Sequence, residues 1–86
     1  PLVAMIAPNP SYRNDAAKGG RLLNGEGPLE AILHAVAVIG YSDDQGAFLI
    51  QDSRGDSFGL EGQWWLPWEF AASPFVVSAM CFSIAN

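Results

Sequence analysis

The chain has few basic residues: four lysines and arginines stand against nine acidic residues, and the net charge is −5 over 86 residues. Proteins that bind nucleic acids use clustered basic side chains to neutralise phosphates, so this composition argues against a nucleic-acid partner. No basic amphipathic segment indicates a membrane surface. The longest apolar runs are about ten residues, well short of the ~20 that a spanning helix needs, and no stretch has the pattern of a secretory signal peptide.

Cysteine and histidine each occur once, as Cys81 and His34. A single cysteine excludes an internal disulfide. One histidine and one cysteine far apart do not provide the ligand spacing of a zinc site, so we expect no metal and no cofactor. The chain begins with Pro1, which fits a processed product, a fragment or one subunit of a cut precursor. These features leave the cellular compartment unknown.

Apolar residues, in contrast, make up 50% of the chain and include three tryptophans and five phenylalanines. This content argues against disorder. A chain of this length forms one small domain or part of one, and it buries roughly 60–65% of the surface of its unfolded state. We therefore expect a thin but real hydrophobic core.

Apolar runs bounded by turn residues predict strands over residues 2–7, 34–41, 46–51, 63–66 and 75–84. Both faces of 34–41 are apolar, which is typical of a strand buried on both sides or of the interior of a small barrel. Pro67 is placed to open a short helix. Residues 8–30 are rich in proline and glycine and predict a long, flexible surface loop with at most one helical turn, at residues 16–18. Tyr12 and Arg13 are the anchoring candidates of this loop. Together these elements predict a mostly β fold, an antiparallel, barrel-like sheet with one short helix.

The polar stretch 42–46 between two apolar runs predicts a hairpin that brings His34 close to Asp52. If the turn holds three residues, His34 lies directly opposite Asp52. If it holds five, His34 lies opposite Arg54 and diagonal to Asp52. Both registers leave the imidazole and the carboxylate on one face, roughly 5–8 Å apart at Cβ. A register shifted by one residue would separate them, because side chains alternate between faces.

The order and spacing of several short motifs resemble the C-terminal half of papain-like cysteine peptidases, most closely the bacterial-type members. The motifs are His-Ala-Val-x-x-x-Gly-Tyr from His34, a polar turn, Gly-Ala-Phe-Leu-x-Gln-x-Ser-x-Gly from Gly46, a glycine-rich loop and Leu-Pro-Trp-Glu-Phe from Leu66. The likeness is good over about residues 32–70. It implies the β-rich right-hand domain of a papain-like α+β fold.

By that resemblance, His34 matches the catalytic histidine, which forms a thiolate–imidazolium pair and later protonates the leaving amine. Asp52 stands where the family usually carries an asparagine that orients the imidazole. The family's nucleophilic cysteine and its oxyanion-hole glutamine lie in an N-terminal helical domain. Neither is matched here: Cys81 falls near the end of the last predicted strand, and Gln51 and Gln63 do not correspond to that glutamine. The nucleophile would come from an absent segment or another chain.

Two departures from the family pattern bear on this site. The first is the aspartate at position 52 in place of asparagine; its carboxylate is able to orient His34 and would favour the imidazolium form. The tryptophan that normally covers this contact is replaced by Arg54, which could pair with Asp52 and compete with His34. Phe58 conserves the next aromatic position of the motif, and Gln51 directly precedes Asp52, so both are site-adjacent.

These observations support two hypotheses of different classes. In the first, residues 1–86 are a single β-rich half-domain that supplies His34 and Asp52 to a thiol enzyme. Its partner is a Cys-bearing domain or chain, its substrate is a peptide or amide, and the chain is not active alone. In the second, Arg54, the aspartate and the missing cysteine mark a non-catalytic relative that binds a peptide or protein. A self-standing β domain with an accidental motif is a third, simpler alternative.

Overall fold

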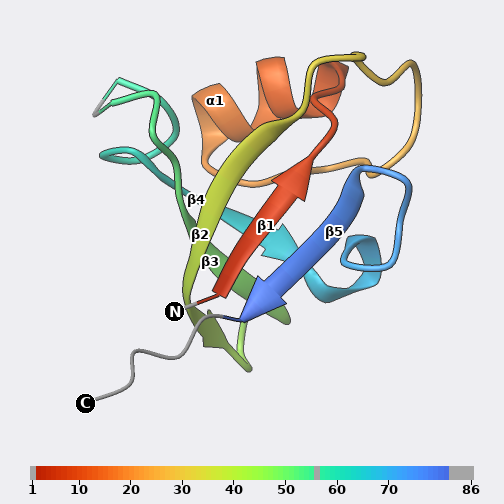
Figure 1. The fold of residues 1–86 in the computed structure, drawn as a ribbon. Coiled ribbons are helices and arrows are strands. Elements are labelled where there is room, and N and C mark those ends of the chain that lie inside the picture. Colours follow the sequence, from red (N-terminus) through yellow and green to blue (C-terminus); the bar gives the residue numbers. More distant parts are fainter. Residues whose placement is uncertain (1, 56, 82–86) are drawn as a thin grey trace.

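The computed structural model describes residues 2–55 and 57–81, which form a five-stranded antiparallel sheet (Figure 1). The strands are β1 (Leu2–Ile6), β2 (His34–Ser42), β3 (Ala47–Gln51), β4 (Gln63–Pro67) and β5 (Val76–Cys81). Their order across the sheet is β4-β3-β2-β1-β5. The mostly β, antiparallel fold expected from the sequence is confirmed.

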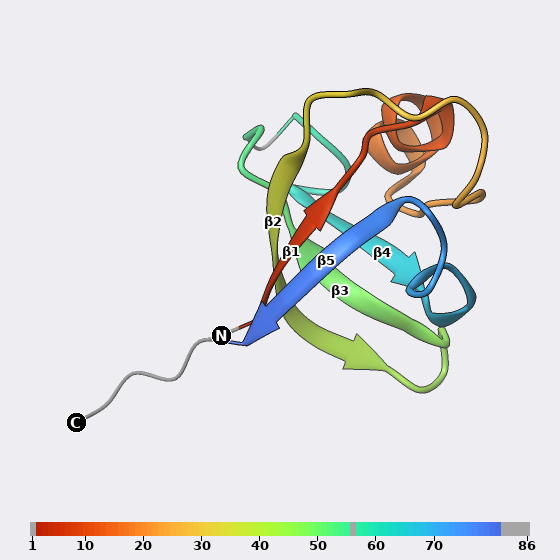
Figure 2. The ribbon, with the colours of Figure 1, turned by 45° about the vertical axis from the view of Figure 1, so that its right-hand side comes forward.

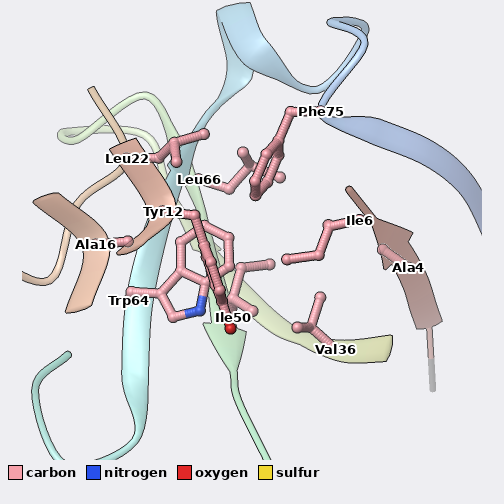
Figure 3. Close-up of a cluster of buried hydrophobic side chains, with 10 residues drawn as sticks. All are labelled: Ala4, Ile6, Tyr12, Ala16, Leu22, Val36, Ile50, Trp64, Leu66 and Phe75. Atoms are coloured by element: carbon pink, nitrogen blue, oxygen red, sulfur yellow. The ribbon is translucent and has the colours of Figure 1, made fainter. Parts of the chain in front are cut away.

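The sheet curls, so that its two outer strands approach each other across one core (Figure 2). Trp64 of β4 and Phe75, which directly precedes β5, have ring centroids 6.1 Å apart, although β4 and β5 lie at opposite ends of the strand order. The side chains that fill the curl come from β1 to β4, the helical segment and the adjoining loops (Figure 3). Val76 of β5 is partly buried against them. Burial of these apolar groups is the main force that closes the sheet on itself.

Strand β2 is buried on one face only, so the expectation of burial on both faces is wrong. Val36 is 3% exposed, whereas its neighbour Ala35 is exposed and Ala37 is half-buried. Ile39 is half exposed. The apolar residues on the second face are small or partly exposed, so composition alone does not reveal which face is covered.

The segment after β1 contains more helix than the single turn that the sequence allowed at residues 16–18, so the prediction of a flexible loop is wrong. A π-helical turn, η1 (Tyr12–Ala16), leads into α1 (Ala17–Gly19). The Tyr12 N–H donates to Asn9 Oδ1 at 2.8 Å, as in a helix cap. Pro10 is tolerated in the first helical turn because no partner is needed there for its missing N–H. The Pro-Asn-Pro stretch that ends the strand therefore also starts the helix.

Two buried polar side chains hold the following segment against this helix. Asn9 Nδ2 donates to the carbonyl oxygens of Asn24 and Glu26, at 3.0 and 2.9 Å. Ser11 Oγ accepts hydrogen bonds from the N–H groups of Leu23 and Asn24, at 2.9 and 3.0 Å. Backbone hydrogen bonds also join residues 20–22 to β4. The helical segment is thereby held over one end of the curled sheet (Figure 1).

The C-terminal part of the described chain follows the sequence-based expectation more closely. A 3-10 turn, η2 (Trp68–Phe70), follows Pro67 as the short helix predicted there. The last strand was expected over 75–84, and β5 covers Val76–Cys81; residues 82–84 lie outside the described residues. Within the described ranges, no helix has the length and apolar character needed to cross a membrane.

The β2–β3 hairpin places His34 and Asp52 on one face as predicted, but with a different turn length. Its turn has four residues, 43–46, rather than three or five. Next to the turn, Ser42 pairs with Ala47, so even-numbered residues face odd-numbered ones. An irregularity at Ile39 shifts the register, and beyond it Val38 pairs with Ile50. This β-bulge inserts one residue and restores the parity that places His34 and Asp52 on the same face.

Candidate functional site

His34 and Asp52 meet at the end of the sheet that the helical segment covers. His34 is the first residue of β2 and pairs with Ile6 of β1, and Asp52 directly follows β3. His34 Nε2 lies 2.8 Å from Asp52 Oδ1, and the two side chains are 18% and 0% exposed. The imidazole–carboxylate pair predicted from the hairpin is therefore present, with the carboxylate fully buried.

Four donors converge on the Asp52 carboxylate. On Oδ1 it accepts from His34 and from the backbone N–H of Arg54, at 2.8 and 3.1 Å. On Oδ2 it accepts from the Tyr12 hydroxyl and the Trp64 indole N–H, at 2.7 and 3.0 Å. Figure 3 shows the Tyr12 oxygen and the Trp64 nitrogen turned toward the same side of the core. Each carboxylate oxygen therefore has two partners, which is the full accepting capacity of the group.

These hydrogen bonds decide the charge of the site. Burial raises the pKa of Asp52, but hydrogen bonds from His34, Tyr12 and Trp64 outweigh it and leave the pKa below its ordinary value. Burial, with the bond to Asp52, raises the pKa of the Tyr12 hydroxyl, which therefore keeps its proton and donates it to the carboxylate. An ionised Asp52 only accepts, so the neutral His34 ring carries its proton on Nε2.

The other ring nitrogen of His34, Nδ1, is free to accept a proton. Among the residues that the structure describes, Nδ1 makes no hydrogen bond. A neutral imidazole protonated on Nε2 has its lone pair on Nδ1, where it accepts a proton. The pair can thus act as an oriented base and, once protonated, as an acid.

Arg54 does not pair with Asp52 through its side chain, so the expected competition with His34 is wrong. The exposed Arg54 side chain instead turns to Tyr12, and its Nε donates to the Tyr12 hydroxyl at 2.9 Å. Its guanidinium carbon lies 5.7 Å from the centroid of the Tyr12 ring. The arginine therefore supports the donor to the carboxylate and leaves the His34 contact intact.

Gln51 and Phe58, the two site-adjacent residues, border the pair without touching the carboxylate. The Gln51 side chain donates to the carbonyl oxygens of Asp52 and Gly62, each at 3.2 Å, so it holds the loop that carries the aspartate. The Phe58 ring lies 4.9 Å from the Tyr12 ring between centroids. Both residues fix the surroundings of Asp52 rather than its hydrogen bonds.

Cys81 is placed far from the pair by the strand register. It pairs with Leu2 at one end of β1, whereas His34 pairs with Ile6 at the other end. Leu2 and Ile6 are four positions apart along β1, a distance of about 13 Å. The side chain of Cys81 lies outside the described part of the structure. Among the described residues, no group of three or more histidine, cysteine or acidic side chains could hold a metal ion.

Tyr12 and Trp64 belong to the site, although sequence reasoning assigned neither to it. The sequence analysis considered Tyr12 only as an anchor of a loop. Both are core residues, with 0% and 1% exposure, but each also aims a donor at Asp52. A usable signal was present: a buried carboxylate requires several donors, and Tyr and Trp combine an apolar body with one donor.

A shallow hollow of about 310 Å³ lies on β1 and β2 and reaches Asp52, but His34 is not part of its lining. Its lining is mostly apolar, from Val3, Ala35 and Ala37, and it extends to Asp52 and Ser53. The hollow is open to solvent and carries no charged group other than the aspartate. It is therefore a surface that another apolar element could cover.

Comparison with known proteins agrees with the resemblance seen in the sequence. No protein-family model matches the chain, and no curated protein matches it. Among solved structures, the chain is similar to xylellain, a cysteine protease from Xylella fastidiosa, with a TM-score of 0.71 and 27% sequence identity. The match covers 92% of this chain and 29% of the xylellain chain. In fold, and over nearly its whole length, the chain is therefore similar to one part of a bacterial papain-like cysteine protease.

Proposed function

We propose that this chain is the His/Asp-supplying β half-domain of a papain-like thiol enzyme. The observation that carries the proposal is the 2.8 Å contact between His34 Nε2 and the buried Asp52 carboxylate, in a fold similar to part of a cysteine protease. The reaction class is acyl transfer through a thioester, with peptide or amide hydrolysis as one outcome and transfer to another amine as the other.

The chemistry would proceed through the free nitrogen of His34. A cysteine thiol placed near Nδ1 gives its proton to the ring, which forms the thiolate and an imidazolium held by the Asp52 carboxylate. The thiolate attacks the substrate carbonyl carbon, and the imidazolium then protonates the leaving amine. Asp52 fixes the ring orientation and offsets its positive charge, the role of the third residue in such a triad.

The cysteine would come from a Cys-bearing N-terminal domain or another chain. In the described strands, the register places the backbone of Cys81 at the opposite end of β1 from His34. The chain spans 29% of the length of xylellain. The activity and the substrate class of a complete enzyme are therefore part of what we propose.

Arg54 supports a second candidate, a non-catalytic domain that binds a peptide or protein partner. Its guanidinium stands where the family's tryptophan covers the contact, and its residue position is exposed. The intact His34–Asp52 contact favours the first candidate over this one, because a domain that only binds does not require it.

The first test is to identify the nucleophile. Native mass spectrometry of the intact assembly, followed by labelling with a thiol-directed acylating probe, should find a reactive cysteine on another segment or chain in contact with this domain. A stable complex in which no cysteine reacts would favour the binding domain instead.

The second test is His34→Ala in the same assembly. We expect amidase activity to fall by about 10²–10⁴-fold, the usual contribution of a general acid–base group. Asp44→Ala is a matched control, since Asp44 lies in the exposed hairpin turn and should leave activity unchanged. Full activity in His34→Ala would refute the proposed role.

A further inference from the structure

The Asp52 site is built for a carboxylate and excludes the amide that the papain-like family usually carries there. All four partners of Asp52 present a hydrogen to it: His34 Nε2, the Arg54 backbone, Tyr12 and Trp64. An asparagine has a single oxygen, which can face only one of the two donor pairs. The amide NH₂ must then face the other pair, donor against donor.

Burial decides which way such an amide would turn. Trp64 is 1% exposed and its indole nitrogen is only a donor, so leaving it without an acceptor is costly. The Arg54 backbone belongs to an exposed turn, where water can replace a lost partner. The oxygen of an asparagine would therefore face Tyr12 and Trp64, and its NH₂ would face His34 Nε2.

We propose that Tyr12 and Trp64 are positioning residues that make position 52 specific for a carboxylate, and that they thereby keep the proton of neutral His34 on Nε2. The proposal deepens the proposed function, because Nδ1 must be free to accept a thiol proton. The donors lie on separate elements, the helical segment and β4, and both contact Oδ2. They prevent the carboxylate from rotating away from His34.

Arg54 completes the arrangement by occupying the Tyr12 oxygen. Its Nε donates to that oxygen at 2.9 Å, which leaves the hydroxyl proton directed at Asp52. Two differences from the family pattern are then coupled: arginine in place of tryptophan at position 54, and aspartate in place of asparagine at position 52. The tyrosine joins the two positions.

The proposal predicts a tautomer switch that can be read directly. His34 is the chain's only histidine, so a two-bond ¹H–¹⁵N correlation spectrum of the full chain, recorded where the ring is neutral, shows one imidazole. In the wild type we expect the proton on Nε2. In Asp52→Asn the proton should move to Nδ1, because Nε2 now meets an NH₂ group and must accept.

A rescue variant separates this mechanism from simple damage. In the double variant Asp52→Asn/Trp64→Phe, the indole donor is gone, so the amide oxygen should return to His34 and the Nε2–H form should reappear. The unfolding midpoint should also fall less when Asp52→Asn is introduced into Trp64→Phe than into the wild type. Tyr12→Phe alone should lower the Nε2–H fraction.

Phe75→Leu is the matched structural control. Phe75 packs against both Tyr12 and Trp64, with ring centroids 6.0 and 6.1 Å away, but offers no donor. The Phe75→Leu variant should lower the unfolding midpoint and leave the His34 tautomer unchanged. Retention of Nε2–H in both Asp52→Asn and Tyr12→Phe would overturn the proposal.

The readout also separates this proposal from the proposed function. It requires no thiol and no substrate, so a domain that only binds would still show the tautomer switch. Conversely, an active assembly whose tautomer does not change in these variants would retain the function and lose the positioning role. If Asp52→Asn does not fold, the comparison of the wild type, Tyr12→Phe and Phe75→Leu still decides the question.

Discussion

The two ends of the curled sheet are built from the same strands but by opposite means. At the His34 end, one buried carboxylate gathers four donors from different parts of the chain. At the other end, apolar side chains that include Val38, Phe48 and Val76 line a hollow of about 180 Å³. Hydrogen bonds impose a single geometry on the first end, whereas dispersion contacts tolerate small changes of shape at the second.

The two ends differ because one contains a buried carboxylate and the other contains only apolar side chains. An apolar hollow loses some packing energy but leaves no group unpaired. A buried carboxylate that loses one partner leaves a donor or a charge without compensation. We therefore expect the free energy of unfolding to respond to the loss of single hydrogen-bonding atoms at the His34 end, and mainly to side-chain volume at the far end. The following experiments test that contrast.

The largest effect on stability should come from Asp52→Ala. It leaves the Tyr12 hydroxyl and the Trp64 indole N–H without an acceptor in the core, and each unpaired buried donor costs about 1–3 kcal/mol. We expect the free energy of unfolding to fall by about 3 kcal/mol in urea titrations. Asp44→Ala at the hairpin turn, the control from the far end, should change it by less than about 0.5 kcal/mol. Equal effects of the two variants would contradict the contrast.

The second experiment follows the same carboxylate with pH. The pKa of Asp52 is lower in the folded state than its ordinary value, so its contribution to stability is present above about pH 4 and is lost as pH falls through the folded-state pKa. The difference in unfolding free energy between the wild type and Asp52→Ala should therefore be largest near neutral pH and shrink toward pH 3. A difference that stays constant over this range would show that the charge is not stabilised in the fold.

The third experiment fills the apolar end. Ala79 lines the far hollow, and Ala79→Val should raise the free energy of unfolding by about 0.5–1 kcal/mol through added apolar contact. Ser78→Val, on the opposite face of β5, controls for the strand preference of valine. The His34 tautomer should be unchanged in both variants. A larger gain from Ser78→Val would mean that the hollow has no packing deficit.

The smallest effect should come from the exposed ion pair between Arg13 and Glu30. Two hydrogen bonds of 2.8 and 2.7 Å join them, and the bond to Arg13 lowers the pKa of Glu30. Water and salt screen such a pair, so Glu30→Gln should leave the urea midpoint almost unchanged. A loss comparable to that of Asp52→Ala would show that burial does not separate these two carboxylates.

The sequence predicted a large part of this arrangement. The strand positions, the antiparallel sheet and the papain-like resemblance follow from local apolar patterns and from spaced motifs between residues 32 and 70, and the structure confirms them. The short turn after Pro67 is present as expected. The hairpin placed His34 and Asp52 near each other because turn residues and alternation are properties of neighbouring residues.

The sequence alone was misleading where long-range contacts override local preference. Residues 8–30 contain prolines and glycines that favour a loop, but Asn9 caps a helix and also holds residues 24 and 26. The apolar composition of β2 suggested burial on both faces, whereas the curl covers only one. These contacts join residues distant in sequence, so no local pattern reports them.

The sequence by itself determined which two residues form the buried imidazole–carboxylate pair, and the tertiary structure decided the geometry of that pair. His34 and Asp52 are set by motif and spacing, but a four-residue turn alone would have put them on opposite faces. The bulge at Ile39 corrects that parity. The donors that hold Asp52, Tyr12 and Trp64, come from 40 residues before it and 12 residues after it. Only the packed core brings them together, because a buried carboxylate must collect its partners from wherever the chain folds past it.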